Sequence, residues 1–99
     1  MNVVFQRADL ARLESDAAFT GGWAPDIIRA YCKVLNLVRQ VDKWPDLYSF
    51  RSLRLEKMKG KRKDQYSMRL NKQYRLIVKF EKKDEEDVML IIGIEDYHD

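Results

Sequence analysis

The chain has 99 residues, of which 45% are hydrophobic and 35% charged, and its net charge is +3. This length and composition predict one folded globular domain over residues 1–99 and exclude a disordered chain. No apolar run approaches the ~20 residues of a membrane-spanning helix, the first residues do not resemble a secretory leader, and the single Cys32 cannot form an internal disulfide, so we expect a cytoplasmic protein with no membrane contact.

The first half of the chain predicts a strand followed by two helices. Residues 2–6 are short and β-branched, which indicates a strand. Apolar residues at helical spacing predict a helix over residues 7–19, which a pair of glycines then ends. The longest helix is predicted from Pro25 to about Lys43, because proline suits a first helical position and an apolar stripe follows it. The stripe consists of Ile27, Tyr31, Val34, Leu35, Val38 and Val41.

The second half predicts short strands in series. Residues 51–56 alternate, with Leu53 and Leu55 on one face, and predict a strand. Residues 66–70 and 74–81 alternate in the same way and predict a hairpin, while residues 88–94 are apolar on both faces, as in a strand covered on both sides. Segregated helices and sequential strands indicate an α+β fold, with two N-terminal helices packed on a largely antiparallel sheet of four or five strands.

The basic residues are concentrated in one window. Residues 51–75 hold ten Lys and Arg but only two acids, a net charge of +8, whereas the rest of the chain has a net charge of −5. A local positive block of this kind indicates a site for a polyanion. The alternative is a solvated surface that keeps the protein soluble, which charged runs commonly are.

The two-residue period of the predicted hairpin indicates where these cations lie. If Met68 faces the helices, the alternate residues lie on the opposite face, which no predicted helix covers. That open face then presents Ser67, Arg69, Asn71 and Arg75, with a basic loop that begins at Lys59 entering beside them. Single-stranded RNA, an extended anion, suits such a surface.

The end of the chain carries its only histidine. His98 follows Asp96 and Tyr97, so that a carboxylate, a phenol and an imidazole occupy three consecutive positions. Imidazole titrates near neutrality, which suits general acid–base catalysis, although a frayed polar tail is the alternative. With one histidine and one cysteine, the sequence offers no typical metal site.

Four stretches of the chain resemble a known family. They are residues 55–60 (LEKMKG), 65–71 (QYSMRLN), 74–76 (YRL) and 95–98 (EDYH). Their pattern is similar to that of HigB toxins of the RelE/ParE toxin–antitoxin superfamily, over about the last half of the chain. The first half matches in layout and length. The resemblance implies a RelE-like fold and a toxin that cleaves mRNA on the ribosome, without a metal or other cofactor, and so arrests translation and growth.

In the chemistry that the resemblance implies, the ribose 2′-hydroxyl attacks the adjacent phosphate and leaves a 2′,3′-cyclic phosphate and a 5′-hydroxyl end. This reaction needs a base, an acid for the leaving oxygen, and cations for the extra charge on phosphorus. By position, the resemblance implies catalytic roles for Lys59, Arg69, Arg75, Asp96, Tyr97 and His98. We expect RNA contacts from Lys57, Lys61, Arg62, Lys63 and Asn71, the last at a position where many relatives carry arginine.

The resemblance also implies partners. HigB toxins are neutralised by HigA, a helix-turn-helix antitoxin, and the complex represses its own operon, so we expect this chain to reach operator DNA only through the antitoxin. The expected targets are mRNA and the A site of the small ribosomal subunit. Two alternatives remain: a toxin of the same fold with another target, such as gyrase in the ParE branch, and an RNA- or antitoxin-binding module with degenerate activity.

Overall fold

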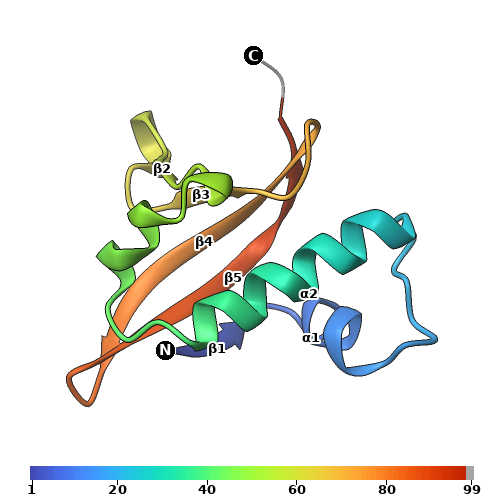
Figure 1. Cartoon of the computed structure of the whole chain (residues 1–99), viewed down its shortest axis with the longest axis horizontal. Helices are drawn as coiled ribbons and strands as arrows, with labels where there is room; N and C mark the ends of the chain where they lie inside the picture. Colours follow the sequence, from blue (N-terminus) through green and yellow to red (C-terminus); the bar gives the residue numbers. More distant parts are fainter. Residues whose placement is uncertain (98–99) are drawn as a thin grey trace.

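The computed structural model describes residues 1–97 (Figure 1). The α-helices within these residues are α1 (Ala8–Ser15) and α2 (Pro25–Arg39), and the 3₁₀ helices are η1 (Trp44–Ser49), η2 (Arg51–Leu53) and η3 (Gly60–Arg62). The strands are β1 (Asn2–Phe5), β2 (Glu56–Lys57), β3 (Tyr66–Arg69), β4 (Tyr74–Lys83) and β5 (Glu86–Asp96). None of the helices in this part of the chain has the length and apolar character needed to cross a membrane.

The strands of the described chain form one five-stranded sheet in the order β1-β5-β4-β3-β2. β1 pairs with β5 in parallel, and the other neighbours pair antiparallel. The predicted α+β fold with a largely antiparallel sheet is therefore confirmed. β5 lies in the interior of the sheet, between β1 and β4.

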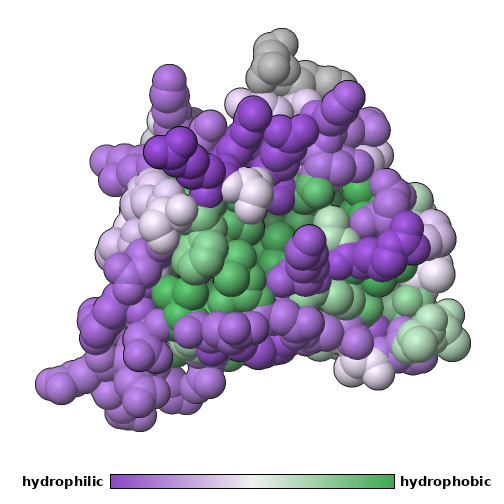
Figure 2. Space-filling model, in the orientation of Figure 1, coloured by the Kyte–Doolittle hydropathy of each residue, from purple (hydrophilic) through white to green (hydrophobic). Residues whose placement is uncertain are grey.

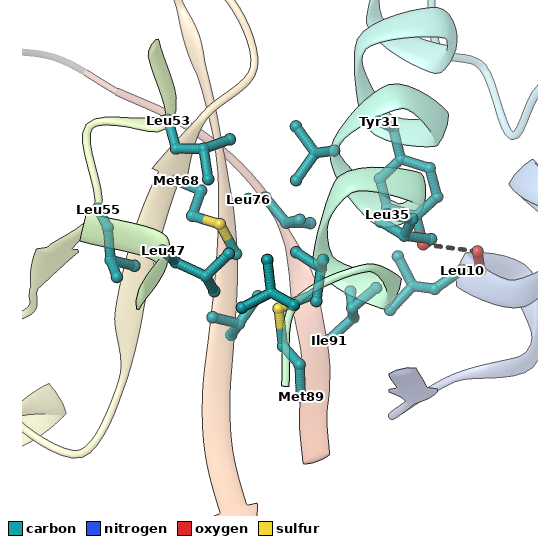
Figure 3. Close-up of a cluster of buried hydrophobic side chains, with 14 of the residues drawn as sticks. Leu10, Tyr31, Leu35, Leu47, Leu53, Leu55, Met68, Leu76, Met89 and Ile91 are labelled. Carbon is teal, nitrogen blue, oxygen red and sulfur yellow. Dashed lines mark hydrogen bonds between the residues drawn. The ribbon is translucent and has the colours of Figure 1, made fainter. Parts of the chain in front are cut away.

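The hydrophobic core lies between α2 and the sheet (Figure 3). Tyr31, Leu35 and Val38 of α2 are fully buried, as are Met68 of β3 and Leu76 of β4. The Tyr31 hydroxyl donates a hydrogen bond of 2.7 Å to the Leu10 carbonyl, which ties α1 to α2. A slip of one residue in the β3–β4 pairing would turn Met68 away from this core, so its burial confirms the predicted register.

Both predicted helices end earlier than the sequence indicates. α1 stops at Ser15 because Asp16 is extended and its carboxylate accepts a hydrogen bond from the Ala18 amide at 3.0 Å. The apolar spacing at Ala17 and Ala18 is misleading, since both residues are exposed. α2 ends at Arg39, four residues before the predicted end, although Val41 beyond it is still buried.

The predicted strand over residues 51–56 is wrong. Its first part forms η2, Arg54 then takes a left-handed conformation with φ of 46°, and only Glu56–Lys57 form a strand. Leu53 and Leu55 are nevertheless both buried. Their two-residue spacing reflects a turn that keeps both leucines in the core, and alternation alone cannot distinguish that turn from a strand.

Candidate active site

The basic loop lies across the face of the sheet that points away from the core. Arg62 of η3 forms a two-pronged ion pair with Glu95 of β5, with Nη1–Oε1 and Nη2–Oε2 distances of 2.9 and 2.6 Å. Beyond η3, Asp64 pairs with Lys79 of β4 at 2.9 Å, and this hydrogen bond lowers the pKa of the Asp64 carboxyl. Ile77, two residues before Lys79 on the same face of β4, is 1% exposed. The face that the sequence predicts as open is therefore partly covered by this loop.

Arg75 lies on that face, as predicted, but it is 5% exposed. Its Nη2 donates hydrogen bonds to the Arg54 carbonyl at 2.6 Å and to the Oγ of Ser67 at 2.9 Å. Its Nε is buried and has no hydrogen-bond partner among the described residues. Burial lowers the pKa of the guanidinium, yet an arginine keeps its proton in proteins. The site thus holds a fixed positive charge.

A pocket of about 330 Å³ opens at Arg75, and we call it the cationic pocket. Arg69 lies directly opposite Arg75 in the β3–β4 pairing, and the Tyr97 ring centre is 5.0 Å from the Arg75 guanidinium carbon. The described residues that line the pocket provide four cations and one carboxylate. They are Arg54, Glu56, Arg69, Asn71, Lys72, Arg75 and Tyr97.

A larger pocket, of about 490 Å³, lies near Met1. Its described lining contains three acidic side chains, Asp42, Glu86 and Asp87, against two basic side chains, Arg39 and Lys43, and the amino group of Met1. That balance does not favour an anionic ligand. The smaller cationic pocket therefore fits the predicted polyanion better.

Asn71 closes the turn between β3 and β4. Its Oδ1 accepts hydrogen bonds from the backbone amides of Gln73 at 2.8 Å and of Tyr74 at 2.7 Å. This turn holds Arg69 and Arg75 in their cross-strand pair. Asn71 thus has a structural function in this chain, and its NH₂ group is what it offers to a ligand in the pocket.

The chain after β5 is tied to the same turn. The Gln73 Nε2 donates to Oδ2 of Asp96 at 3.2 Å, and the Tyr97 amide donates to the Gln73 carbonyl at 2.6 Å. As far as Tyr97 the tail is thus anchored beside the cationic pocket, and it is not frayed. His98, the predicted proton donor or acceptor, lies outside the described residues.

The structure brings together only some of the residues that the sequence predicts for the site. Arg69, Asn71, Arg75 and Tyr97 line the cationic pocket. The exposed lysines of β2 and of the loop, Lys57, Lys59, Lys61 and Lys63, are not among its lining residues, and Arg62 is engaged with Glu95.

Sequence reasoning misses three residues of the pocket: Arg54, Glu56 and Lys72. The sequence pattern places Arg54 in a strand, so its left-handed turn and the hydrogen bond that its carbonyl accepts from Arg75 could not be foreseen. Glu56 gives a signal that could be used, because it is one of two acids in the basic window at residues 51–75. Lys72 gives no signal beyond its charge.

Comparisons with known proteins agree with the fold. A family model described as "RelE-like toxin of type II toxin-antitoxin system HigB" matches residues 4–98. A solved structure described as "YoeB/ParE toxin from Agrobacterium tumefaciens" is similar to the chain, with 16% identity, a TM-score of 0.58, and coverage of 99% of this chain and 100% of that one. At this identity the likeness shows the shared fold. No curated protein sequence matches the chain.

Proposed function

The chain belongs to the HigB-like toxin family of type II toxin–antitoxin systems, and on this premise we propose that it is an mRNA endoribonuclease that acts on the ribosome in the cytoplasm. The observation that carries the proposal is the guanidinium of Arg75, which the Ser67 hydroxyl and the Arg54 carbonyl hold in the wall of the cationic pocket. Arginine pairs with phosphate through charge-assisted hydrogen bonds, so an RNA phosphate would be a suitable ligand for this pocket.

The proposed reaction requires no group beyond side chains and RNA. A base removes the proton of the ribose 2′-hydroxyl, the oxygen attacks the adjacent phosphorus, and the bond from phosphorus to the 5′-oxygen breaks. An acid gives the leaving oxygen a proton. The products are a 2′,3′-cyclic phosphate and a 5′-hydroxyl end. Arg75 and Arg69, opposite each other, would stabilise the additional negative charge that develops on the phosphate.

Glu56 is the base that we propose for the first proton transfer, because it is the carboxylate among the described residues that line the cationic pocket. For the leaving oxygen we propose His98 or Tyr97 as the acid, with Asp96 orienting the imidazole. The Tyr97 ring contacts the Arg75 guanidinium, and this contact supports placing Tyr97 and its neighbour His98 close to the reacting phosphate. Lys59 would add a cation from the loop beside the pocket.

The proposed path of the RNA leads from the cationic pocket over the basic loop. Lys57, Lys61 and Lys63 are exposed and would contact phosphates, and the amide of Asn71 would contact RNA inside the pocket. Arg62 would take part indirectly, because its pairing with Glu95 fixes the loop on the sheet. We propose a HigA-like helix-turn-helix protein as the antitoxin, through which the complex would bind operator DNA.

Mapping the 5′ ends of cellular transcripts after a brief induction of the chain tests this function. We expect new 5′-hydroxyl ends in phase with the reading frame, and none with Arg75→Lys. DNA damage without transcript cuts would indicate a gyrase poison of the same fold. Growth inhibition without transcript cuts or DNA damage would indicate a binding module with degenerate activity. So would the absence of growth inhibition.

A further inference from the structure

Arg75 has an acidic neighbour in the sheet as well as a basic one. In the strand pairings it lies directly opposite Arg69 of β3 on one side and directly opposite Glu95 of β5 on the other. Opposed residues of an antiparallel pair lie on the same face, with their Cβ atoms about 4.5–5.5 Å apart, and opposite charges at such positions attract. Yet within residues 1–97 no ion pair or hydrogen bond joins Glu95 to Arg75.

The basic loop holds the Glu95 carboxylate elsewhere. Both of its oxygens accept hydrogen bonds from Arg62 of η3, at 2.9 and 2.6 Å. The Nε of Arg62 donates to Oε1 of Gln65 at 3.0 Å, which fixes the guanidinium from a second side. Arg75 bonds toward β3, to the Oγ of Ser67. The acid and the base that are opposed in the sheet are thus each bound to a different partner.

The pair of Arg62 and Glu95 is open to water. β2 and the end of β5 both lie at the top of Figure 1, and the surface there is hydrophilic in Figure 2, whereas apolar surface lies lower, beside α2. The side chains of Arg62 and Glu95 are 39% and 44% exposed. An ion pair with this exposure contributes little to the stability of a fold. Substitutions should therefore break it without unfolding the chain.

We propose that Arg62 is a positioning residue that keeps Glu95 away from Arg75. A Glu95 carboxylate that is released from Arg62 would pair with Arg75, its opposed neighbour, and compete with an anion for that guanidinium. Because Arg62 belongs to η3, the contact of the basic loop with the sheet and the availability of Arg75 become one event. The consequence for catalysis rests on the proposed function, in which Arg75 stabilises the reacting phosphate.

The test is a titration of the purified chain with inorganic phosphate, followed by NMR at the guanidinium of Arg75. Arg62→Gln should weaken phosphate binding by about tenfold or more, because Glu95 then competes for Arg75. Glu95→Gln alone should bind phosphate at least as tightly as the parent. Arg62→Gln combined with Glu95→Gln should return the affinity to within about twofold of the parent, since the amide in place of the carboxylate carries no charge.

Two control variants separate this effect from a change of net charge and from a loosened loop. Lys79→Gln removes the same charge as Arg62→Gln and breaks the other ion pair of the loop, with Asp64, but it releases no acid opposite Arg75. Its phosphate affinity should stay within about twofold of the parent. Arg62→Gln combined with Asp64→Asn has the net charge of the restored variant but keeps the Glu95 carboxylate, so its binding should stay weak.

Thermal unfolding of each variant shows whether it is folded. Arg62→Lys, which keeps the charge but loses the two-pronged bond, is a second test and should bind phosphate with intermediate affinity. Equal phosphate affinities of Arg62→Gln and Lys79→Gln would overturn the proposal, and so would a parent that does not bind phosphate. Weak binding that Glu95→Gln does not restore would also overturn it, because Arg62 would then contact the anion itself.

Cleavage of mRNA separates this inference from the proposed function. Arg62→Gln should cut about tenfold more slowly than the parent. Arg62→Gln combined with Glu95→Gln should cut about as fast as Lys79→Gln, in which one ion pair of the loop is also broken. If phosphate binding follows the expected pattern but the parent cuts no RNA, the inference stands and the proposed function fails. If Arg62→Gln cuts RNA as fast as the parent, the inference fails and the function stands.

Discussion

Arg69 of β3 and Arg75 of β4 lie directly opposite each other in the sheet, on the face away from the core. Like charges at opposed positions destabilise a strand pair. Neighbouring contacts hold this pair in place, since Asn71 closes the turn between the two strands and Ser67 accepts a hydrogen bond from Arg75. The strand pairing thus places two arginines side by side in the lining of the cationic pocket, where both can contribute to binding an anion.

Because Arg69 and Arg75 repel each other, we expect that removing one of these charges makes the fold more stable and the toxin less active. Arg69→Thr should raise the free energy of unfolding by about 0.2–1 kcal/mol, because it removes the repulsion from Arg75. The same substitution should slow RNA cleavage. Urea denaturation measures the first effect, with Arg69→Lys as the control that retains the charge. Equal stability of the two variants would contradict this explanation.

The surroundings of Arg75 predict that charge alone does not suffice at this position. Arg75 makes its bonds to the Ser67 Oγ and the Arg54 carbonyl through Nη2 alone, whereas a lysine has a single nitrogen and lacks the planar fork that can hold these two acceptors and a phosphate at once. Arg75→Lys should therefore reduce single-turnover cleavage by about 10²–10³-fold. Because Arg75 is buried, Arg75→Ala would also remove packing, and the lysine variant is the cleaner test. Near-parental cleavage with a folded Arg75→Lys would show that the guanidinium is not needed.

The acid stability of the protein should depend on Asp87, which is 4% exposed. The pKa of its carboxyl is held below the usual range, first by a hydrogen bond from the Trp44 amide and then by Lys82. A carboxyl whose pKa is lower in the folded state stabilises the protein above its usual pKa, and this contribution is lost as the pH falls through the folded value. Asp87→Asn should therefore be less stable than the parent at neutral pH.

The difference in unfolding free energy between the parent and Asp87→Asn should shrink as the pH is lowered through the acidic range, below about pH 4. Urea denaturation of both proteins across that range measures it. A gap that stays constant down to the most acidic solution would show that ionised Asp87 does not stabilise the fold. Asp84→Asn, at the exposed turn between β4 and β5, is the control that should change little.

The loop lysines can be tested separately from the cationic pocket. Neutralising both with Lys61→Gln and Lys63→Gln should weaken ribosome binding and make its salt dependence shallower, by about 0.7 in the log–log slope for each phosphate that a lysine no longer neutralises. The measurement is the affinity for programmed ribosomes at several salt concentrations. Lys83→Gln is the control. An unchanged slope would mean that these lysines only keep the surface solvated.

The core and the strand register could be predicted from the sequence because each depends on a regular period. Met68 and Leu70 are apolar and Arg69 between them is charged, so the face with Met68 and Leu70 must be the buried one. The apolar stripe of α2 has the 3.6-residue period of a helix. Helix ends are harder, because a single side chain such as Asp16 can end α1 by bonding the backbone.

The site could be predicted in part. Arg75 and Arg69 could be placed on the correct face, but the burial of Arg75 could not, because it depends on contacts distant in sequence. The Arg62–Glu95 pair joins residues 33 positions apart, and the bond from Arg75 to the Arg54 carbonyl requires a left-handed turn that no residue period reveals. The same turn brings Arg54 into the pocket wall.

Single-turnover cleavage of mRNA on programmed ribosomes tests the central claim most directly, namely that the cationic pocket is the active site of a ribonuclease. The parent should release fragments with 2′,3′-cyclic phosphate and 5′-hydroxyl ends. Glu56→Gln and His98→Ala should each slow this step by about 10²–10⁴-fold, and Arg75→Lys by about 10²–10³-fold, while Lys83→Glu cleaves at the parental rate. Cleavage by all three pocket and tail variants at near-parental rates, or fragments with other ends, would contradict this claim.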